Sequence, residues 1–265
     1  FEPISILNAP NQKSMFTAGG GANINKYDAV EAEIAVSQND VNLFSEVDAD
    51  DDNGTAFKII HSTNDRPVSF LSEYQFNSEL SFEYNSESFS FIDRLRYIEF
   101  DWDWSYNPND FTQNFAENIL NANVSLSKDA SNKLDYRLVR RKRGDAVDGF
   151  QHYFNLSKSL GRLQTRFDAY LMKNDQVALS SEWNRFKFDV AYGSKWFIPG
   201  YRYQQDRNAV RSQFDDRVVS TAMNFSEHTF YLKNADTLKT TYGIDYQLRE
   251  DRLPINGMLL DNNQS

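Results

Sequence analysis

The chain has 265 residues, of which 15% are aromatic, and it contains no cysteine. Its formal net charge of -10 argues against a nucleic-acid partner, because phosphate binding requires a concentrated basic surface. The lack of cysteine excludes disulfides, thiolate metal sites and cysteine nucleophiles.

In chain order, the first 28 residues predict a flexible entry segment, because Gly19-Gly20-Gly21 lies in the middle of it. From 29 to 251, apolar and polar residues alternate almost throughout. In SEYQFNSELSFEYN (72–85), for example, the apolar side chains would lie on one face and the polar ones on the other. No long stripe of helical period interrupts this pattern. We therefore expect one antiparallel β domain over 29–251, followed by a tail or link at 252–265.

Short polar connections between these runs favour a meander of roughly a dozen or more hairpin-linked strands. The connection at 197–216 is expected to be a long loop, because it contains a Pro-Gly pair. A closed outer-membrane-type barrel and a soluble sandwich or jelly roll would both hide the sheet edges. Densely charged polar faces and runs of about 9–11 residues favour the barrel, or part of one.

Three stretches carry a resemblance: EAEIAVSQNDVNLFSEVDADDDNGTAFKI (31–59), FIDRLRYIEFDWDW (91–104) and TTYGIDYQLRED (240–251). They resemble segments of large, uncharacterised outer-membrane and cell-envelope β proteins of Bacteroidota. The resemblance implies an exported piece of a longer protein, at the outer membrane or surface of a Gram-negative bacterium. It implies no reaction and no functional residues.

The stretch YIEFDWDWSY (97–106) raises an enzymatic alternative. Its acids Glu99, Asp101 and Asp103 are similar to the E-x-D-x-E strand motif of laminarinase/lichenase-type glycoside hydrolases. By resemblance, Glu99 would be the nucleophile, Asp101 its tuning residue and Asp103 the general acid/base. On a strand, these alternate residues share one face, which suits the carboxylate spacing of a retaining hydrolase. The motif has Asp103 where the family has Glu, so the acid would be one methylene too short.

Two further stretches suggest binding. Asp48, Asp50 and Asp52 alternate before Asn53-Gly54 and would suit a Ca²⁺ site, although no bidentate acid follows at the spacing of a helix-loop-helix site. Trp196, Tyr201 and Tyr203 lie in the expected 197–216 connection or beside it, where exposed rings would suit a glycan or a peptide.

The prediction is thus an all-β cell-envelope protein without enzymatic activity, with a structural, transport or assembly role in the outer membrane. Its expected partners are outer-membrane lipid or envelope proteins, and a glycan is a further candidate. The alternatives are the secreted jelly-roll hydrolase with Glu99, Asp101 and Asp103, and a soluble extracellular binding module.

Overall fold

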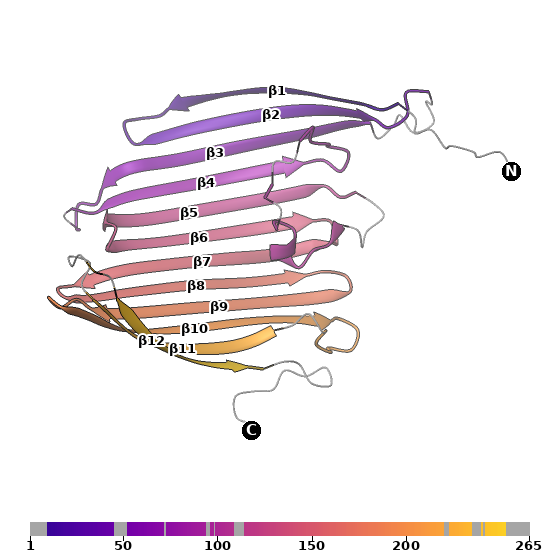
Figure 1. Cartoon of the computed structure of the whole chain (residues 1–265). Coiled ribbons are helices and arrows are strands. Elements are labelled where there is room, and N and C mark those ends of the chain that lie inside the picture. Colours follow the sequence, from indigo (N-terminus) through magenta and orange to yellow (C-terminus); the bar gives the residue numbers. More distant parts are fainter. Residues whose placement is uncertain are drawn as a thin grey trace.

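The computed structural model describes residues 10–44, 52–71, 73–93, 96–97, 99–108, 114–219, 223–234, 240 and 242–252. Twelve strands form one antiparallel sheet in which each strand pairs with its neighbours in sequence (Figure 1). The strands are β1 (Gln12–Asn23), β2 (Asp28–Asp40), β3 (Asn53–Pro67), β4 (Gln75–Asn85), β5 (Glu117–Asp129), β6 (Asn132–Arg143), β7 (Val147–Leu160), β8 (Leu163–Asp175), β9 (Leu179–Tyr192), β10 (Phe197–Ser212), β11 (Met223–Asn234) and β12 (Gly243–Asp251). The predicted all-β meander is confirmed.

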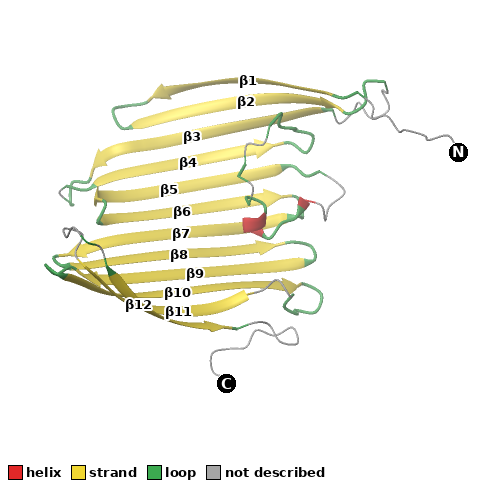
Figure 2. Ribbon diagram, viewed as in Figure 1, coloured by secondary structure: helices red, strands yellow, loops and turns green. Residues whose placement is uncertain are grey.

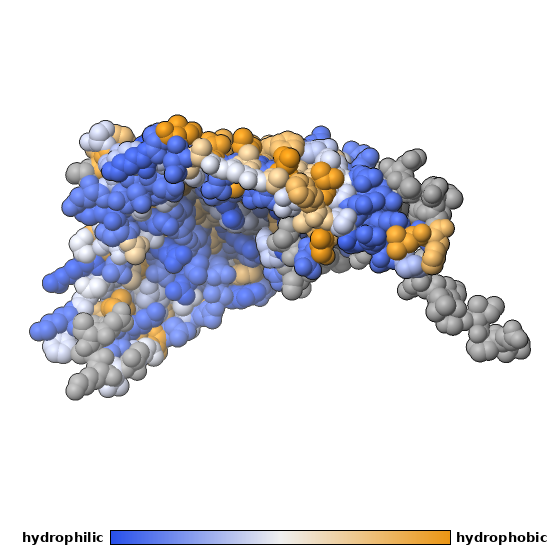
Figure 3. Space-filling view, turned by 90° about the horizontal axis from the view of Figure 1, so that it is seen from above, coloured by the Kyte–Doolittle hydropathy of each residue, from blue (hydrophilic) through white to orange (hydrophobic). Residues whose placement is uncertain are grey.

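The sheet has two chemically different faces. Residues that pair across two strands lie on the same face, so the register assigns each side chain to a face. One face, called here the inner face, carries mostly polar and charged residues and lies on the hollowed side of the curved sheet (Figure 3). The outer face is mostly apolar, and many of its large side chains are exposed, including Phe16, Ile34, Phe57, Leu80, Val124, Phe150, Leu171, Phe188, Phe230, Ile244, Tyr246 and Leu248.

The sheet is open. Within the described part of the chain, β1 pairs only with β2 and β12 pairs only with β11, and Figure 1 places these two strands at opposite edges. Small clusters of buried residues lie on the inner face. Among the residues that the structure describes, none form a second layer over the outer face (Figure 2). No helix in the described ranges has the length and apolarity needed to span a membrane.

Three local predictions differ from the structure. Residues 12–23, expected to be a flexible entry, form β1, and all three glycines pair with β2. The expected loop at 197–216 is wrong over 197–212, which is β10; Pro199 and Gly200 both hold places in its ladder with β11. The alternation in 97–106 does not form a strand, because its described residues fold into turns around a single 3-10 turn, Trp102–Trp104. Residues 253–265 of the expected tail lie outside the described residues.

Candidate functional site

A short segment between β4 and β5 lies on the inner face. We call residues 99–106 the strap; it contains the 3-10 turn drawn in red over the sheet in Figure 2. Ser105 closes the turn with a positive φ of 51° and donates its backbone N–H to the carbonyl of Trp102. The turn explains why alternation misleads here: Trp102 is exposed and Trp104 is buried, although a strand would put them on one face.

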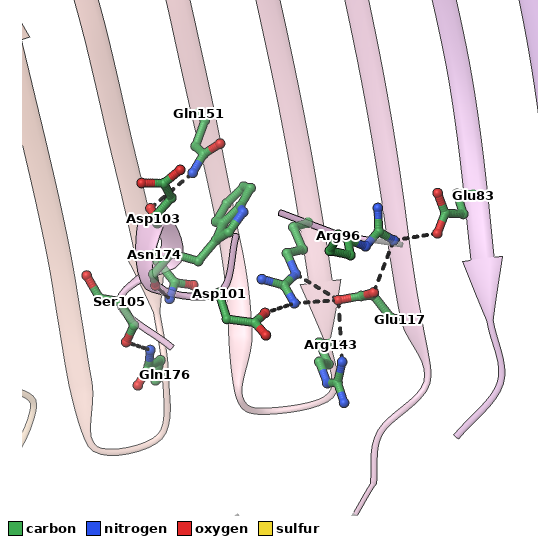
Figure 4. A network of polar contacts seen from close by, with 12 residues as sticks. Glu83, Arg96, Asp101, Asp103, Ser105, Glu117, Arg143, Gln151, Asn174 and Gln176 are labelled. Atoms are coloured by element: carbon green, nitrogen blue, oxygen red, sulfur yellow. Dashed lines mark hydrogen bonds and ion pairs between the residues drawn. The ribbon is translucent and has the colours of Figure 1, made fainter. Parts of the chain in front are cut away.

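Three consecutive strap carbonyls accept hydrogen bonds from side-chain amides of β7, β8 and the β8–β9 turn (Figure 4). Gln151 Nε2 donates to the Asp103 carbonyl at 3.1 Å, Asn174 Nδ2 to the Trp104 carbonyl at 2.6 Å, and Gln176 Nε2 to the Ser105 carbonyl at 2.7 Å. Backbone carbonyls of a non-strand segment need such partners when water is excluded. The inner face is therefore built to hold this segment in one position.

A buried ion-pair cluster holds the strap from the other side. Arg141 of β6 is 1% exposed, and its Nη2 lies 2.6 Å from Asp101 Oδ1 of the strap and 2.6 Å from Glu117 Oε1 of β5. Arg96 pairs with Glu83 and lies 3.5 Å from Glu117, while Arg143 lies 3.7 Å from it (Figure 4). A buried carboxylate is tolerated only with such compensation. Glu117 thus anchors three cations, and Asp101 joins the strap to them.

Aromatic rings fill the space around this cluster. Trp104 and Tyr106 pack in a buried cluster with Ala146 of the β6–β7 turn and Val147, the first residue of β7. The guanidinium of Arg141 lies 4.4 Å from the ring centroid of Phe100, so an aromatic face covers the cation. Trp102 extends away from this cluster and meets the ring of Trp183 edge-on, at 5.3 Å between centroids.

The strap also carries a tyrosine–carboxylate pair. Tyr97, which precedes it, donates its hydroxyl to Asp103 Oδ2 at 2.5 Å. Partial burial, reinforced by this carboxylate, raises the pKa of Tyr97. Burial likewise raises the pKa of Tyr106. The Tyr97 phenol therefore stays protonated, as the donor to Asp103, well above neutral pH.

Beside the strap, the inner face encloses a hollow of about 790 Å³ that runs from β3 to β10. Its lining combines carboxylates, guanidinium groups, a lysine and side-chain amides with the rings of Tyr153 and Tyr170. The Tyr170 hydroxyl reaches the Asp103 carbonyl at 3.3 Å, so hollow and strap adjoin.

The three acids of the hydrolase alternative do not converge. Asp101 forms an ion pair with Arg141, Asp103 accepts a hydrogen bond from Tyr97, and Glu99 is exposed. That alternative depended on a strand that would align the three carboxylates, and the strand is absent because the segment turns. The prediction of a shared acidic face is therefore wrong. Sequence reasoning missed Arg141 and Glu117. The only signal for Arg141 was its place in a run of basic residues, and the only signal for Glu117 was its place just before an apolar stretch.

The other sequence candidates lie apart. Asp48 and Asp50 of the suggested Ca²⁺ site fall outside the described residues, while Asp52 precedes β3. In the part of the chain that the structure describes, no three His, Asp or Glu side chains are grouped as metal ligands. Trp196 is exposed in the β9–β10 turn. Tyr201 and Tyr203 lie on the outer face of β10, where Tyr201 Oη and His228 Nδ1 are 2.9 Å apart.

The outer apolar residues do not follow the cross-strand rows of the sheet. One outer row begins with apolar residues on β2, β3 and β4 and becomes polar or charged from β5 onward: Ile34, Phe57, Tyr84, Asn118, Lys142, Asp148, Asp175, Ser180. A second row has the opposite trend, starting at Arg66 and continuing as Phe76, Leu126, Leu134, Leu156, Phe167, Phe188 and Tyr203. The apolar residues therefore form a belt that crosses the strands obliquely.

The slope of this belt can be measured. On β2 the outward apolar residues are Val30, Ala32, Ile34 and Val36, and Glu33 is their midpoint. Following the cross-strand pairs from Glu33 over seven successive strand pairs leads to Ser181 on β9. The corresponding residues of β9, Phe186 to Tyr192, centre on Asp189, eight positions away. With ~3.4 Å per residue and ~4.8 Å between strands, the belt lies roughly 40° from the perpendicular to the strands.

Comparisons with known proteins add no relative. No family model, curated protein or solved structure matches this chain.

Proposed function

We propose that this sheet is part of the wall of an outer-membrane β-barrel and that the protein has a structural, transport or assembly role rather than an enzymatic one. In this arrangement the outer face meets lipid and the inner face lines an aqueous lumen. The observation that carries the proposal is the oblique apolar belt.

An oblique belt has a specific physical meaning. Strands of a membrane barrel tilt about 35–45° from the barrel axis, because closing a sheet requires a stagger between neighbours. The bilayer contacts a band of the barrel that is perpendicular to the barrel axis. Because the strands are tilted, the lipid-facing residues shift along each successive strand by an amount that the tilt determines. The slope of roughly 40° agrees with that range. A soluble sheet that buries one face against a second layer has no reason to displace its apolar residues by about one position per strand.

The two faces support the same reading. Charged pairs such as Arg202–Asp189 and Arg185–Asp206 lie on the inner face, where water would solvate them. Lipid would instead meet side chains such as Ile34 and Phe188, which are exposed with no described residue covering them. Exposed apolar area of this extent is rare on soluble monomers.

The connections indicate an orientation. At one end, β5–β6 and β7–β8 are joined by two-residue turns. At the other end lie the longest connections, 41–52, 86–116 and 213–222. Outer-membrane barrels have short periplasmic turns and longer extracellular loops. The end that carries the strap is accordingly the cell-exterior end.

Single-cysteine labelling tests the proposal, since the natural chain has no cysteine. Ala122 and Asn123 are neighbours on β5, with Ala122 outward and Asn123 inward. In lipid vesicles, Asn123→Cys should react with a water-soluble maleimide and Ala122→Cys should not, whereas both should react after denaturation. Equal reactivity of the folded variants in vesicles, or failure of the folded chain to associate with vesicles, would overturn the proposal.

A further inference from the structure

We infer that the hollow beside the strap is a binding site for a neutral, hydroxyl-rich ligand of the saccharide class, with the Trp102 ring as its stacking surface. This inference does not depend on the membrane proposal, because the site lies on the inner face and can be assayed in any solvent that keeps the chain folded.

The hollow has the size and composition of a polar binding site. Its volume of about 790 Å³ lies within the ~300–1,000 Å³ of known small-molecule sites. Side-chain amides, among them Asn77, Asn123 and Gln204, line it together with carboxylates and guanidinium groups. A side-chain amide can donate to one hydroxyl and accept from its neighbour, and a carboxylate can accept from two neighbouring hydroxyls, which a sugar ring presents in quantity.

Charges of both signs line the hollow, and some of its carboxylates are paired. Arg185 Nε lies 2.9 Å from Asp206 Oδ2, and Asp168 accepts from Asn155 and from Arg166 Nε at 3.1 Å. Four carboxylates and three cationic side chains line the hollow in total, so it has no dominant sign. A ligand with one net charge would therefore meet like charges as well as opposite ones in the hollow. A neutral ligand can use the polar atoms without this repulsion, which favours it over an anion or a cation.

Trp102 supplies the apolar surface that such a ligand needs. It is 56% exposed, although the strap that carries it is fixed by three amide–carbonyl hydrogen bonds and an ion pair. Its ring meets Trp183, whose face is covered by the Arg185 guanidinium at 3.7 Å. Arg185 and Tyr170 both contact Trp183 and both line the hollow, so Trp102 stands one side chain beyond this lining, where a ligand that extends past the hollow would meet it. The negative face of an indole attracts the C–H groups on one side of a pyranose ring, as aromatic faces attract positive edges.

Titration with defined oligosaccharides tests this inference. The probes are maltohexaose, cellohexaose and laminarihexaose as neutral ligands, and hexagalacturonate and a glycine-serine hexapeptide as charged and non-saccharide comparisons. Binding to the full chain is measured by calorimetry at low and high salt. At least one neutral hexasaccharide should bind saturably and independently of salt, and Trp102→Ala should weaken it at least tenfold.

Trp196→Ala is the matched control, because Trp196 is 57% exposed but lies in the β9–β10 turn, away from the strap. It should change affinity less than twofold. Trp102→Phe keeps a ring on the strap and should retain much of the binding, which separates stacking from a folding defect. Lack of binding by all three neutral probes, tighter binding of the charged probe, or equal losses in the two tryptophan variants would each overturn the inference. Since no membrane is required, these outcomes are distinct from failure of the cysteine-labelling test.

Discussion

Arg141 and Asp101, forty residues apart in sequence, are joined by an ion pair of 2.6 Å between Nη2 and Oδ1. Arg141 comes from the middle of the sheet and Asp101 from the strap, so this contact ties a non-strand segment to a strand. The same guanidinium also binds Glu117, whose side chain is only 6% exposed. The strap and the β5–β6 pair therefore share one electrostatic anchor.

Removing this anchor should be costly. In Arg141→Gln the Glu117 carboxylate loses its main partner while it stays buried, and breaking a buried pair costs about 3–5 kcal/mol. The neighbouring Arg140 offers a control, because it faces outward and pairs with the half-exposed Asp148. Arg140→Gln should lower the free energy of unfolding by less than about 1 kcal/mol. Urea unfolding of both variants measures the difference, and equal effects would refute a buried anchor.

Gly149 should be essential for seating the strap. A Cβ at this position would lie 2.5 Å from the Lys173 carbonyl oxygen and 3.0 Å from Trp104 Cζ3. Gly149→Ala should therefore displace Trp104 and destabilise the fold by about 1–3 kcal/mol, the usual effect of overpacking. At Gly20 of β1 an added Cβ meets nothing within 4 Å, so Gly20→Ala should be neutral or mildly stabilising. Near-ultraviolet circular dichroism, which reports the tryptophan environment, together with urea unfolding distinguishes the two variants.

The amide–carbonyl bonds predict how the strap responds to protease. Asn174 donates to the Trp104 carbonyl and accepts from the Asp148 N–H at 3.0 Å. In Asn174→Ala the Trp104 carbonyl and the Asp148 N–H both lose their hydrogen-bond partner. Each such loss at a buried group lowers the free energy of unfolding by about 1–3 kcal/mol. Chymotrypsin should then cleave within the strap faster than in the natural chain, because strap residues are aromatic and less firmly held. Asn184→Ala, on the outer face of β9, should leave the cleavage rate unchanged; equal rates in all three proteins would contradict the prediction.

The alternation of apolar and polar residues was sufficient to predict the sheet, because a strand with two different environments requires period two. The alternation failed to predict the strap because apolar and polar residues can also alternate in a segment that is not a strand. In the strap, each side chain has its own separate partner or environment. Trp104 is buried against Gly149, Asp101 reaches Arg141, and Trp102 remains exposed. Gly149 and Arg141 belong to strands that are distant in sequence, and no residue pattern within 97–106 predicts these contacts.

The failure at β10 has a different cause. Pro199 and Gly200 are typical of turns, but both fit the ladder here, and Gly200 leaves room for the Tyr231 ring, whose Cζ would lie 2.1 Å from an added Cβ. The oblique belt also could not be predicted from the sequence. Its slope depends on the register between strands, and turn length alone leaves the register unknown across long connections such as 86–116.

The belt itself yields the sharpest test, because Ile34 of β2 and Ser180 of β9 lie in one cross-strand row and both face outward. If the belt meets lipid, Ile34 lies near the bilayer centre and Ser180 beyond its edge. Ile34→Arg should then destabilise the folded chain in lipid vesicles by about 2–4 kcal/mol, and Ser180→Arg by about 1 kcal/mol or less. Phe188→Arg, on the same strand as Ser180 but within the belt, should behave like Ile34→Arg. Urea unfolding in vesicles measures all three variants. If Ser180→Arg and Ile34→Arg have equal costs while Phe188→Arg is mild, the lipid boundary follows the strand rows and the tilt deduced from the belt is wrong.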